Sequence, residues 1–300
     1  MTLVLGILLD RLVGDPDRHW HPVAAFGRLA AAVERRAHAD DVRSGALAWL
    51  LVCVPLVLVI AVMGSASATF SEPVAQVFSA VVIWAAIGWR SLFEHVEACR
   101  LATSYDDRRR AVGRIVGRNL DRASEDDLRA AILESLAENA SDAVVAPLFW
   151  AVVAGPAGAA FFRIANTLDA MWGHRNPRYE RFGKWAARVD DLACFLPARL
   201  TSIGLILAGR CRSFGLVWRD AQGHLSPNAG YPEAALAHAL GIRLGGPVRR
   251  GVRVERRVWL GRSESPLPRE VDLGRGIDVV GNALWVCAAV LVIVDLGWTS

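Results

Sequence analysis

The stretch GALAWLLVCVPLVLVIAVMG, from Gly45 to Gly64, carries no charged side chain. Its length matches the roughly 20 apolar residues that an α-helix needs to cross the hydrocarbon core of a bilayer. The stretches PVAQVFSAVVIWAAIGW (73–89) and GNALWVCAAVLVIV (281–294) are shorter and similarly apolar. A soluble protein can bury one such run as a core helix, but several runs in one chain favour an integral membrane protein.

The overall composition agrees with a membrane location. The chain has 300 residues, 53% of them hydrophobic, a net charge of +4 and a mean hydropathy of +0.30. Its basic residues form no single patch interleaved with aromatic side chains, which argues against a nucleic-acid partner. The five cysteines are scattered without CxxC or Cys/His spacing, so neither a zinc site nor a disulfide framework is expected.

The charges that flank the apolar runs predict how the chain is threaded. The loop SASATFSEP (65–73) has no Lys or Arg, whereas Arg43 and Arg90 lie outside the two apolar runs that it joins. By the positive-inside rule this loop is external and both long flanks are cytoplasmic. We therefore expect a helical hairpin here, preceded by an amphipathic helix from about Val23 to Arg36.

A second apolar region predicts a break. The stretch ESLAENASDAVVAPLFWAVVAG (134–155) joins three acids to an uncharged run, and the chain beyond this run is basic again. Pro147 and the Gly155–Pro156 pair interrupt a helix. We expect a broken or re-entrant helix pair, which a membrane tolerates where the free backbone groups line a protein-buried or wet cavity. The predicted fold is an all-α, polytopic helical bundle with this broken pair and cytoplasmic helical loops, in one domain over residues 1–300.

The three acids are spaced four residues apart. On an α-helix, Glu134, Glu138 and Asp142 would stack along one face, where like charges repel and add no stability. A solvated helix face is one explanation of such clustered acids. The other is a metal–nucleotide site at the membrane surface. Carboxylates are costly near an apolar environment, Asn139 and Ser141 add neutral oxygens, and Mg²⁺ prefers oxygen ligands together with waters and phosphates.

A second group of polar residues lies in FRIANTLDAMWGHRNPRYERFGKWAARVDDLACFLPARLT (162–201). Its oxygen-bearing and basic candidates are Asn166, Asp169, Asp190, Asp191, Lys184, Arg188 and Arg199. Ion pairs alone explain acids beside bases, but such groups also suit a phosphate that is held through a metal and clamped by arginine. Asn228 in SPNAGYPEAA precedes a predicted helix N-terminus, which is a natural anion site.

Four stretches carry long and unusual motifs, including E-N-x-S-D-x-V-V-A-P and N-T-L-D-x-M. They are GDPDRHWHPVAAFGRL (14–29), ESLAENASDAVVAPLFW (134–150), NTLDAMWGHRNPRYERFGKWAARVDDLACFLPARLT (166–201) and SPNAGYPEAALAHALGIRLGGP (226–247). Here the sequence closely resembles the adenosylcobinamide-phosphate synthase family of cobalamin biosynthesis, CobD/CbiB. The resemblance implies a multi-pass enzyme of the cytoplasmic (inner) membrane. Such an enzyme joins (adenosyl)cobyric acid to aminopropanol or aminopropanol phosphate as an amide, giving (adenosyl)cobinamide or its phosphate, with ATP as co-substrate and Mg²⁺.

The resemblance also implies roles for the candidate residues, which we state as hypotheses. The metal–nucleotide site would take its donors from two stretches: Glu134 as an outer member, Glu138, Asn139, Asp142, Asn166 and Asp169. Mg²⁺ itself is assigned to three of these: Glu138, Asp142 and Asp169. Substrate or nucleotide phosphates would meet Lys184, Arg188 and Arg199, with Asn228 nearby. The base that takes a proton from the attacking amine would be Asp190 or Asp191. Expected partners are the corrinoid, the amino alcohol or its phosphate, membrane lipid and other membrane enzymes of the cobalamin pathway.

A membrane transporter or scaffold is the alternative function. Transporters place ionisable groups within their spans and often show paired repeats, whereas here the clearest spans are nearly free of charge and no repeat is visible. A phospho-alcohol transferase is a further alternative, but its closely spaced D-x-x-D signature is missing. The chain also lacks a GxxxxGK[ST] loop, so ATP would bind without a P-loop. Acids gathered at the ends of apolar runs favour an enzyme at the membrane face.

Overall fold

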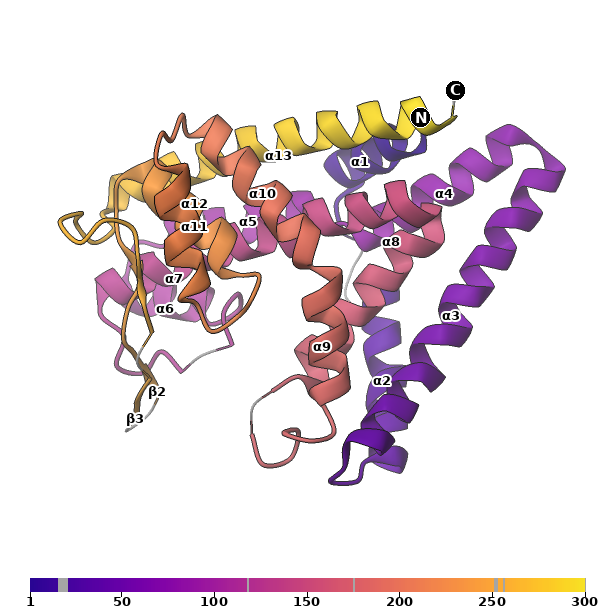
Figure 1. Ribbon diagram of the computed structural model, residues 1–300, viewed down its shortest axis with the longest axis horizontal. Helices are drawn as coiled ribbons and strands as arrows, with labels where there is room; N and C mark the ends of the chain where they lie inside the picture. The colour runs from indigo at the N-terminus through magenta and orange to yellow at the C-terminus, as the bar shows by residue number, and fades with distance from the viewer. Residues whose placement is uncertain (16–20, 118, 175, 251–252, 256, 300) are drawn as a thin grey trace. The chain divides into compact units, whose positions relative to one another are not determined.

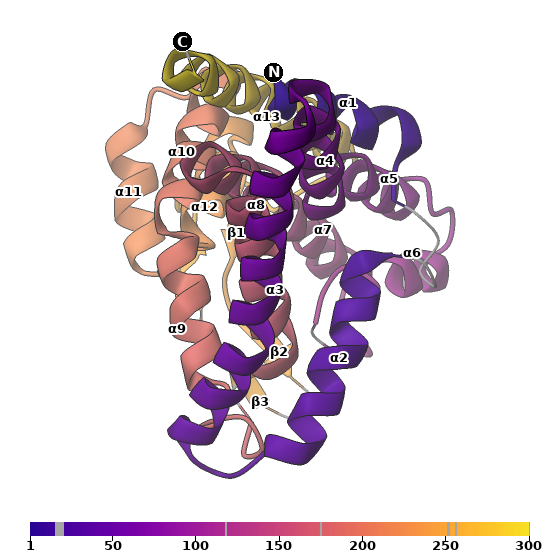
Figure 2. The same cartoon turned by 90° about the vertical axis from the view of Figure 1, so that its right-hand side faces the viewer.

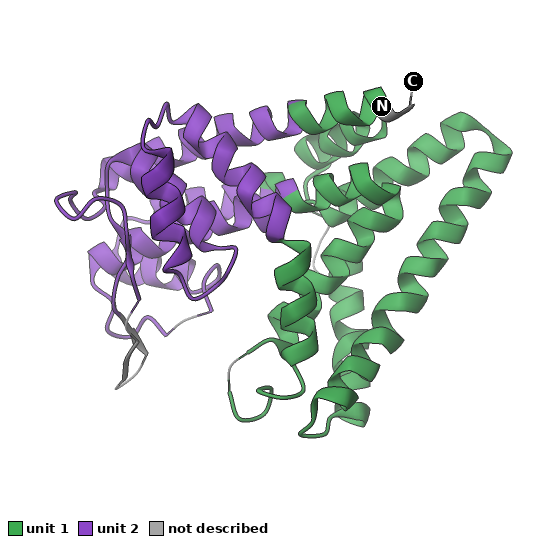
Figure 3. Cartoon of the chain, in the orientation of Figure 1, with its two compact units in different colours: residues 1–90, 146–194, 290–300 green, residues 91–145, 195–289 purple. Residues whose placement is uncertain are grey.

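The computed structural model describes residues 1–15, 21–117, 119–174, 176–250, 253–255 and 257–299. Most of these residues are α-helical, as the sequence predicts. Contacts along the chain divide it into two compact units, each assembled from segments that are distant in sequence (Figure 3). Unit 1 contains residues 1–90, 146–194 and 290–300, and unit 2 contains residues 91–145 and 195–289. Whether both units fold as the single predicted domain over residues 1–300 stays a prediction.

Unit 1 is helical (Figure 1). Its helices are α1 (Thr2–Val13), α2 (Pro22–Ala37), α3 (Val42–Phe70), α4 (Glu72–Ala86), α8 (Ala146–Trp172) and α9 (Lys184–Ala193). The predicted amphipathic helix at 23–36 is confirmed as α2. Helices α2, α3, α8 and α9 lie against one another (Figure 2). Large apolar side chains fill the space between them, including Trp49 and Val52 of α3 and Leu168 and Trp172 of α8.

The predicted hairpin is present, but its turn is much shorter than the sequence suggested. Helix α3 continues to Phe70 and α4 begins at Glu72, so most of the predicted loop 65–73 is helical. Ser71 alone has extended backbone between them, and its side chain accepts a hydrogen bond from the Val74 amide. Small residues in SASATF do not break a helix on their own, and the hydroxyl of Ser67 bonds back to the Gly64 carbonyl.

Helix α8 contains the predicted break. Ala154 and Gly155 have non-helical backbone angles, and Gly155 has a φ of 61° with a ψ of −153°. Pro156 follows, which removes one backbone N–H donor and disfavours helical geometry in the residue before it. Pro147 does not break the helix, because the π-helical turn directly before it accommodates the backbone group that a proline leaves without its partner.

A second discontinuity, between α4 and the following helix α5 (Trp89–Arg100), has charged side chains at both of its ends. The guanidinium Nε of Arg163, on α8, donates to the Ala86 carbonyl at 2.6 Å. The carboxylate of Asp10, on α1, accepts from the Arg90 amide at 3.0 Å. A cation at a helix C-terminus and an anion at a helix N-terminus both complement the helix dipole. This arrangement satisfies backbone groups that the break would otherwise leave without partners.

Unit 2 contains the remaining helices and a few short strands. The helical elements are α5 after Arg90, α6 (Tyr105–Val112), α7 (Glu125–Ala140), a π-helical segment (Ser141–Val145), α10 (Phe195–Ala208), α11 (Phe214–Gln222), α12 (Gly230–Leu240) and most of α13 (Glu270–Thr299). The strands β1 (Leu244–Gly245) and β4 (Trp259–Leu260) form one antiparallel pair, and β2 (Val248–Arg250) and β3 (Arg253–Glu255) form another. These strands are a small addition to the all-α fold.

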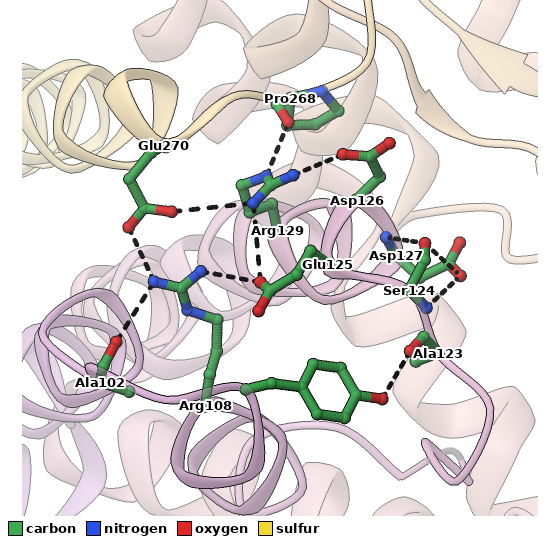
Figure 4. A network of polar contacts seen from close by, with 11 residues as sticks. Ala102, Arg108, Ala123, Ser124, Glu125, Asp126, Asp127, Arg129, Pro268 and Glu270 are labelled. Atoms are coloured by element: carbon green, nitrogen blue, oxygen red, sulfur yellow. Dashed lines mark hydrogen bonds and ion pairs between the residues drawn. The ribbon is translucent and has the colours of Figure 1, made fainter.

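Ion pairs join α6, α7 and the start of α13 (Figure 4). Arg108 of α6 lies 2.8 Å from Glu125 and 2.9 Å from Glu270. Arg129, one turn further along α7, donates to the Pro268 carbonyl at 2.9 Å. Ser124 and Asp127 form a reciprocal capping box at the N-terminus of α7. The start of α7 is therefore fixed, and with it the register of the acids further along this helix.

The described residues include four helical stretches with the length and apolar composition to cross a membrane. These are Val42–Phe70, Glu72–Arg100, Glu125–Trp172 and Glu270–Gly297. The bent pair of α9 and α10 adds a fifth if it forms one span. The predicted all-α, polytopic membrane fold with a broken helix is confirmed.

Candidate functional site

The predicted oxygen donors of unit 1 form one group, which we call the α8–α9 acidic cluster: Asn166, Asp169, Asp190 and Asp191. The amide Nδ2 of Asn166 donates to Oδ1 of Asp190 at 3.2 Å. The carboxylate of Asp169 is close enough to those of Asp190 and Asp191 for their charges to repel. Two stretches about 20 residues apart in sequence thus supply one cluster of carboxylate and amide oxygens.

Local packing explains why α8 and α9 meet at this point. Ala193 and Cys194, at the end of α9, pack with Ala146 and Phe162 of α8. The indole Nε1 of Trp150 donates to the Ala193 carbonyl at 3.0 Å, which occupies a backbone acceptor at the C-terminus of α9. The thiol of Cys194 lies 3.6 Å from Oδ2 of Asp190. Apolar packing therefore holds the cluster on one side.

Lys184 and Arg188 are on the exposed side of α9, four residues apart. They belong to the same helix as Asp190 and Asp191, as predicted. At this spacing the two cations are neighbours on the helix surface. Their prediction as phosphate-binding groups remains a prediction, and their exposure leaves both side chains accessible to a substrate or to lipid headgroups.

The carboxylates predicted in unit 2 have different surroundings. Glu134 is buried in α7, and its Oε1 accepts from the Gly245 amide at 2.9 Å. Glu138 is exposed one turn later, while Asn139 is half-buried and donates to the Ser135 carbonyl at 2.9 Å. Glu134 thus connects α7 to strand β1, whereas Glu138 is exposed on the surface of unit 2.

The spacing of four residues does not extend to Asp142. Helix α7 ends at Ala140, and Asp142 lies in the π-helical segment that follows. A π-helical turn is wider than an α-helical turn, so Asp142 is displaced around the axis from the position that α-helical spacing predicts. The hydroxyl of Ser141 is buried here without a hydrogen-bond partner. Single π-helical turns are frequent at functional sites, which supports this segment as a candidate.

Arg199 and Asn228, predicted as substrate-binding residues, contact each other in unit 2. The guanidinium Nη1 of Arg199 donates to Oδ1 of Asn228 at 3.0 Å and to the Phe195 carbonyl at 2.7 Å. The same guanidinium stacks 3.6 Å from the centre of the Phe195 ring and 4.1 Å from that of Tyr231. Asn228 lies two residues before α12, as predicted. The structure adds a role that sequence did not suggest, because Arg199 fixes the turn that leads into α12.

The predicted magnesium ligands fall in both units. Glu138 and Asp142 are in unit 2, and Asp169 is in unit 1. Across the described ranges, no three His, Cys, Asp or Glu side chains are grouped closely enough to hold a metal ion by themselves. The oxygen donors nevertheless suit Mg²⁺, which commonly binds through one or two carboxylates and completes its shell with waters and substrate phosphates.

One group of residues near the acidic cluster was missed by the sequence analysis. Glu34 of α2 accepts hydrogen bonds from Arg178 and Tyr179, which precede α9. A single acid in the run AAAVERRA has no local signal, because its partners are 144 and 145 residues away in sequence. Only the tertiary structure reveals this contact.

Comparison with known proteins places the chain in a family. The family model described as CobD/Cbib protein matches residues 3–280. The chain belongs to the CobD/Cbib family. Three relatives from this family are each named cobalamin biosynthesis protein CobD. The Chromobacterium violaceum relative is 41% identical over 96% of this chain and 94% of its own length. Those from Rhodobacter capsulatus and Stutzerimonas stutzeri are each 38% identical over 99% of this chain and 98% of their own lengths.

The resemblance stated from motifs is thereby confirmed over nearly the whole chain. The match to the CobD/Cbib model covers the α8–α9 acidic cluster, the carboxylates of α7 and the Arg199–Asn228 pair. No solved structure matches the chain.

Proposed function

We propose that this chain acts in cobalamin biosynthesis as an enzyme of the inner membrane. It would join a carboxylate of (adenosyl)cobyric acid to aminopropanol or aminopropanol phosphate as an amide, at the expense of ATP. The observation that carries the proposal is the family match over residues 3–280, together with relatives named for cobalamin biosynthesis. The apolar helices are compatible with the membrane location.

Amide formation sets chemical requirements that the candidate residues can meet. A carboxylate is unreactive toward an amine until a phosphoryl or nucleotidyl group from ATP converts one of its oxygens into part of a leaving group. Such transfers depend on positioning and on neutralising phosphate charge. The amine must then lose a proton as it attacks, which requires a base within hydrogen-bond reach.

The oxygen donors divide between these tasks. Within unit 2 we propose Glu138 and Asp142 as magnesium ligands, with Asn139 as a neutral oxygen donor. Within unit 1 we propose Asp169 as a magnesium ligand, with Asn166 as a neutral oxygen donor. When bound, Mg²⁺ would neutralise the phosphate charge of the nucleotide. Asp190 or Asp191 is the proposed base. Asp190 already accepts a hydrogen bond from Asn166, which orients its carboxylate.

The basic residues would hold phosphate. Lys184 and Arg188 are exposed on α9, and Arg188 can offer a bidentate contact that Lys184 cannot. Arg199 has two nitrogens engaged with Asn228, Phe195 and Pro227. We therefore propose that Arg199 acts mainly by fixing the turn before α12, and that Lys184 and Arg188 meet the phosphates directly.

The test is an assay of the full-length chain, purified into lipid nanodiscs. Cobyric acid, ATP and Mg²⁺ are supplied with either amine, and corrinoid products are identified by mass. The proposal predicts a product heavier than cobyric acid by the amine less one water. A parallel uptake experiment with labelled corrinoid in sealed vesicles addresses the transporter alternative. Uptake without any amide product would overturn the proposed enzyme activity.

A further inference from the structure

Glu34 of α2 forms a buried anchor for the connection between α8 and α9. Its side chain is 10% exposed, and its Oε1 accepts from Nη2 of Arg178 at 2.9 Å, Nε of Arg178 at 3.3 Å and the hydroxyl of Tyr179 at 2.8 Å. His38, which follows the C-terminus of α2, has its Nε2 2.9 Å from the Arg178 carbonyl. Hydrogen bonds to a charged group are stronger than those between neutral groups. The bonds that Glu34 accepts from Arg178 and Tyr179 are therefore the main polar contact between α2 and the connection.

The anchored connection, residues 173–174 and 176–183, is packed closely at both ends. Gly173 follows α8 directly, and a Cβ on it would lie 1.9 Å from Oδ1 of Asp169. Gly183 precedes α9 directly, and a Cβ on it would lie 1.7 Å from the Trp172 carbonyl oxygen. Glycine is therefore required at both positions, because any side chain would displace the neighbouring group. The connection is already in close contact with Asp169 and with the C-terminus of α8, so it cannot shift toward either without displacing it.

The same connection is seated against α3. A Cβ on Gly45 would lie 1.8 Å from the Phe182 carbonyl oxygen, so the backbone of the connection rests directly on α3. The Phe182 ring packs against the His38 ring, with centroids 4.9 Å apart. Within the connection, Oδ1 of Asn176 accepts from the Arg178 and Tyr179 amides at 3.0 and 3.1 Å. These contacts make it a defined structure whose position depends on α2 and α3.

From this geometry we propose that Glu34 is a positioning residue for the α8–α9 acidic cluster. By holding Arg178 and Tyr179, it sets where α9 begins relative to the end of α8. That placement brings Asn166 and Asp169 on α8 next to Asp190 on α9. Glu34 touches none of the cluster itself and acts through the connection. The catalytic consequence rests on the proposed function, whereas the effect on the cluster does not.

Cys194 allows the effect on the cluster to be measured without any enzyme activity. This thiol is buried and contacts Asp190, so its alkylation by N-ethylmaleimide requires α8 and α9 to separate locally. Cys53 is also buried in unit 1, but it lies in the separate core where α3 packs against α2, α8, α9 and the connection. It serves as an internal control for general loosening of the unit.

The experiment compares the full chain with Glu34→Gln, Tyr179→Phe and the control Glu180→Gln in nanodiscs. Glu180 is an exposed acid of the same connection. Alkylation at each cysteine is followed by mass. We expect Glu34→Gln and Tyr179→Phe to accelerate alkylation of Cys194 by about tenfold. Loss of one hydrogen bond to a charged group should favour the local opening that exposes Cys194 by a factor of this order. Cys53 and the Glu180→Gln chain should keep wild-type rates.

Kinetic constants from the amide-forming assay complete the test. The two anchor variants should lower kcat by about tenfold with little change in KM for cobyric acid, because misplaced groups lose contacts made in the transition state. Unchanged alkylation of Cys194 in both variants would overturn the proposal, as would equal acceleration at Cys53. Faster alkylation with an unchanged kcat would refute the catalytic consequence. If the wild-type chain forms no amide, the proposed function fails, and the alkylation rates still decide the role of Glu34.

Discussion

At the scale of single residues, two carboxylates one turn apart in α7 have opposite surroundings. Glu134 is buried and accepts a hydrogen bond from Gly245 in strand β1, whereas Glu138 is exposed. Burying a carboxylate is costly unless polar partners compensate, so the bond to the Gly245 amide is central to the position of Glu134. The two acids should therefore respond differently to substitution.

We predict that Glu134→Ala lowers the free energy of unfolding by about 1–3 kcal/mol, because it leaves the half-buried Gly245 amide without its acceptor. Glu134→Gln keeps an acceptor oxygen and should cost less. Glu138→Gln should leave stability unchanged and abolish product. Denaturant unfolding in detergent micelles and the amide-forming assay measure these effects. A stable but inactive Glu134→Gln chain would support Glu134 as an outer member of the site.

A pH effect is expected at His224, which lies in the turn before α12. Its Nδ1 accepts from the Ser226 amide at 3.1 Å, and burial lowers its pKa below the ordinary value of 6.5. The unfolded chain then binds more protons than the folded chain between the lowered pKa and 6.5. Stability from this group is full above that range and is lost as the pH falls through it.

We therefore predict that His224→Gln flattens the decrease in thermal stability on acidification from about pH 7 to about pH 5. The carboxylate of Glu233, 3.8 Å from Nε2 of His224, opposes the effect of burial and limits its size. His95→Gln, at an exposed position, is the control and should keep the wild-type profile. An unaltered pH profile in His224→Gln would contradict this account of the turn.

Residue chemistry was partly predictable from the sequence. The motifs around Asn166 and Asp190 marked residues that the structure brings together. The anchor at Glu34 was not predictable, because hydrogen bonding to residues 144 and 145 positions away leaves no local pattern. Likewise, the spacing of Glu134 and Glu138 gave them one helix face but could not distinguish the buried acid from the exposed one.

At the scale of secondary-structure elements, the break in α8 depends on one glycine. Gly155 has a φ of 61° and a ψ of −153°, a combination that residues with a Cβ rarely adopt. Apart from its own stretch of chain, none of the described residues has an atom within 4 Å of the position where its Cβ would be, so a substitution there meets conformational strain without a clash.

We predict that Gly155→Ala destabilises the protein by about 1–3 kcal/mol through this strain. Gly274→Ala is the matched control, since Gly274 is in α13 and also has open space around its Cβ position. Alanine favours helix over glycine, so this control should be neutral or slightly stabilising. Equal stability of the two variants in thermal unfolding would show that the break does not depend on the glycine conformation.

The ends of helices were predictable where one residue or one pair of adjacent residues is enough to start or to interrupt a helix. The pair Gly155–Pro156 and the capping residues of α2 and α7 mark a break and two helix starts. Pro147 misled the prediction because a local π-helical turn can accommodate a proline inside a continuous helix. The π-helical segment at Ser141–Val145 was not predicted from the sequence.

At the scale of the whole molecule, the charge distribution predicts a sidedness. The turn at Ser71 should be external, and the segment before α3 should be cytoplasmic. We predict that Ser71→Cys, in a chain whose native cysteines are replaced, reacts with a membrane-impermeant thiol reagent in intact cells. Ala39 is exposed and precedes the N-terminus of α3, whereas Ser71 follows its C-terminus. Ala39→Cys should therefore react only after permeabilisation. Labelling of both from outside would refute the positive-inside assignment.

The division into two units was not predictable from the sequence. Each unit combines segments that are far apart in the chain, and no linker or shift in composition marks a boundary. The membrane character was predictable, because apolar length is a property of contiguous residues. Contacts between distant segments depend on side-chain packing, which a single sequence does not display.

The most direct test of the account follows oxygen from the corrinoid carboxylate. Cobyric acid with both oxygens of the reacting carboxylate labelled with oxygen-18 is incubated with the protein, ATP, Mg²⁺ and the amine. If ATP activates this carboxylate, one labelled oxygen must leave with the transferred group. We predict one label in phosphate or AMP and the other in the amide product. Amide formed with the second label only in water, and none in phosphate or AMP, would contradict ATP-dependent activation of the corrinoid carboxylate.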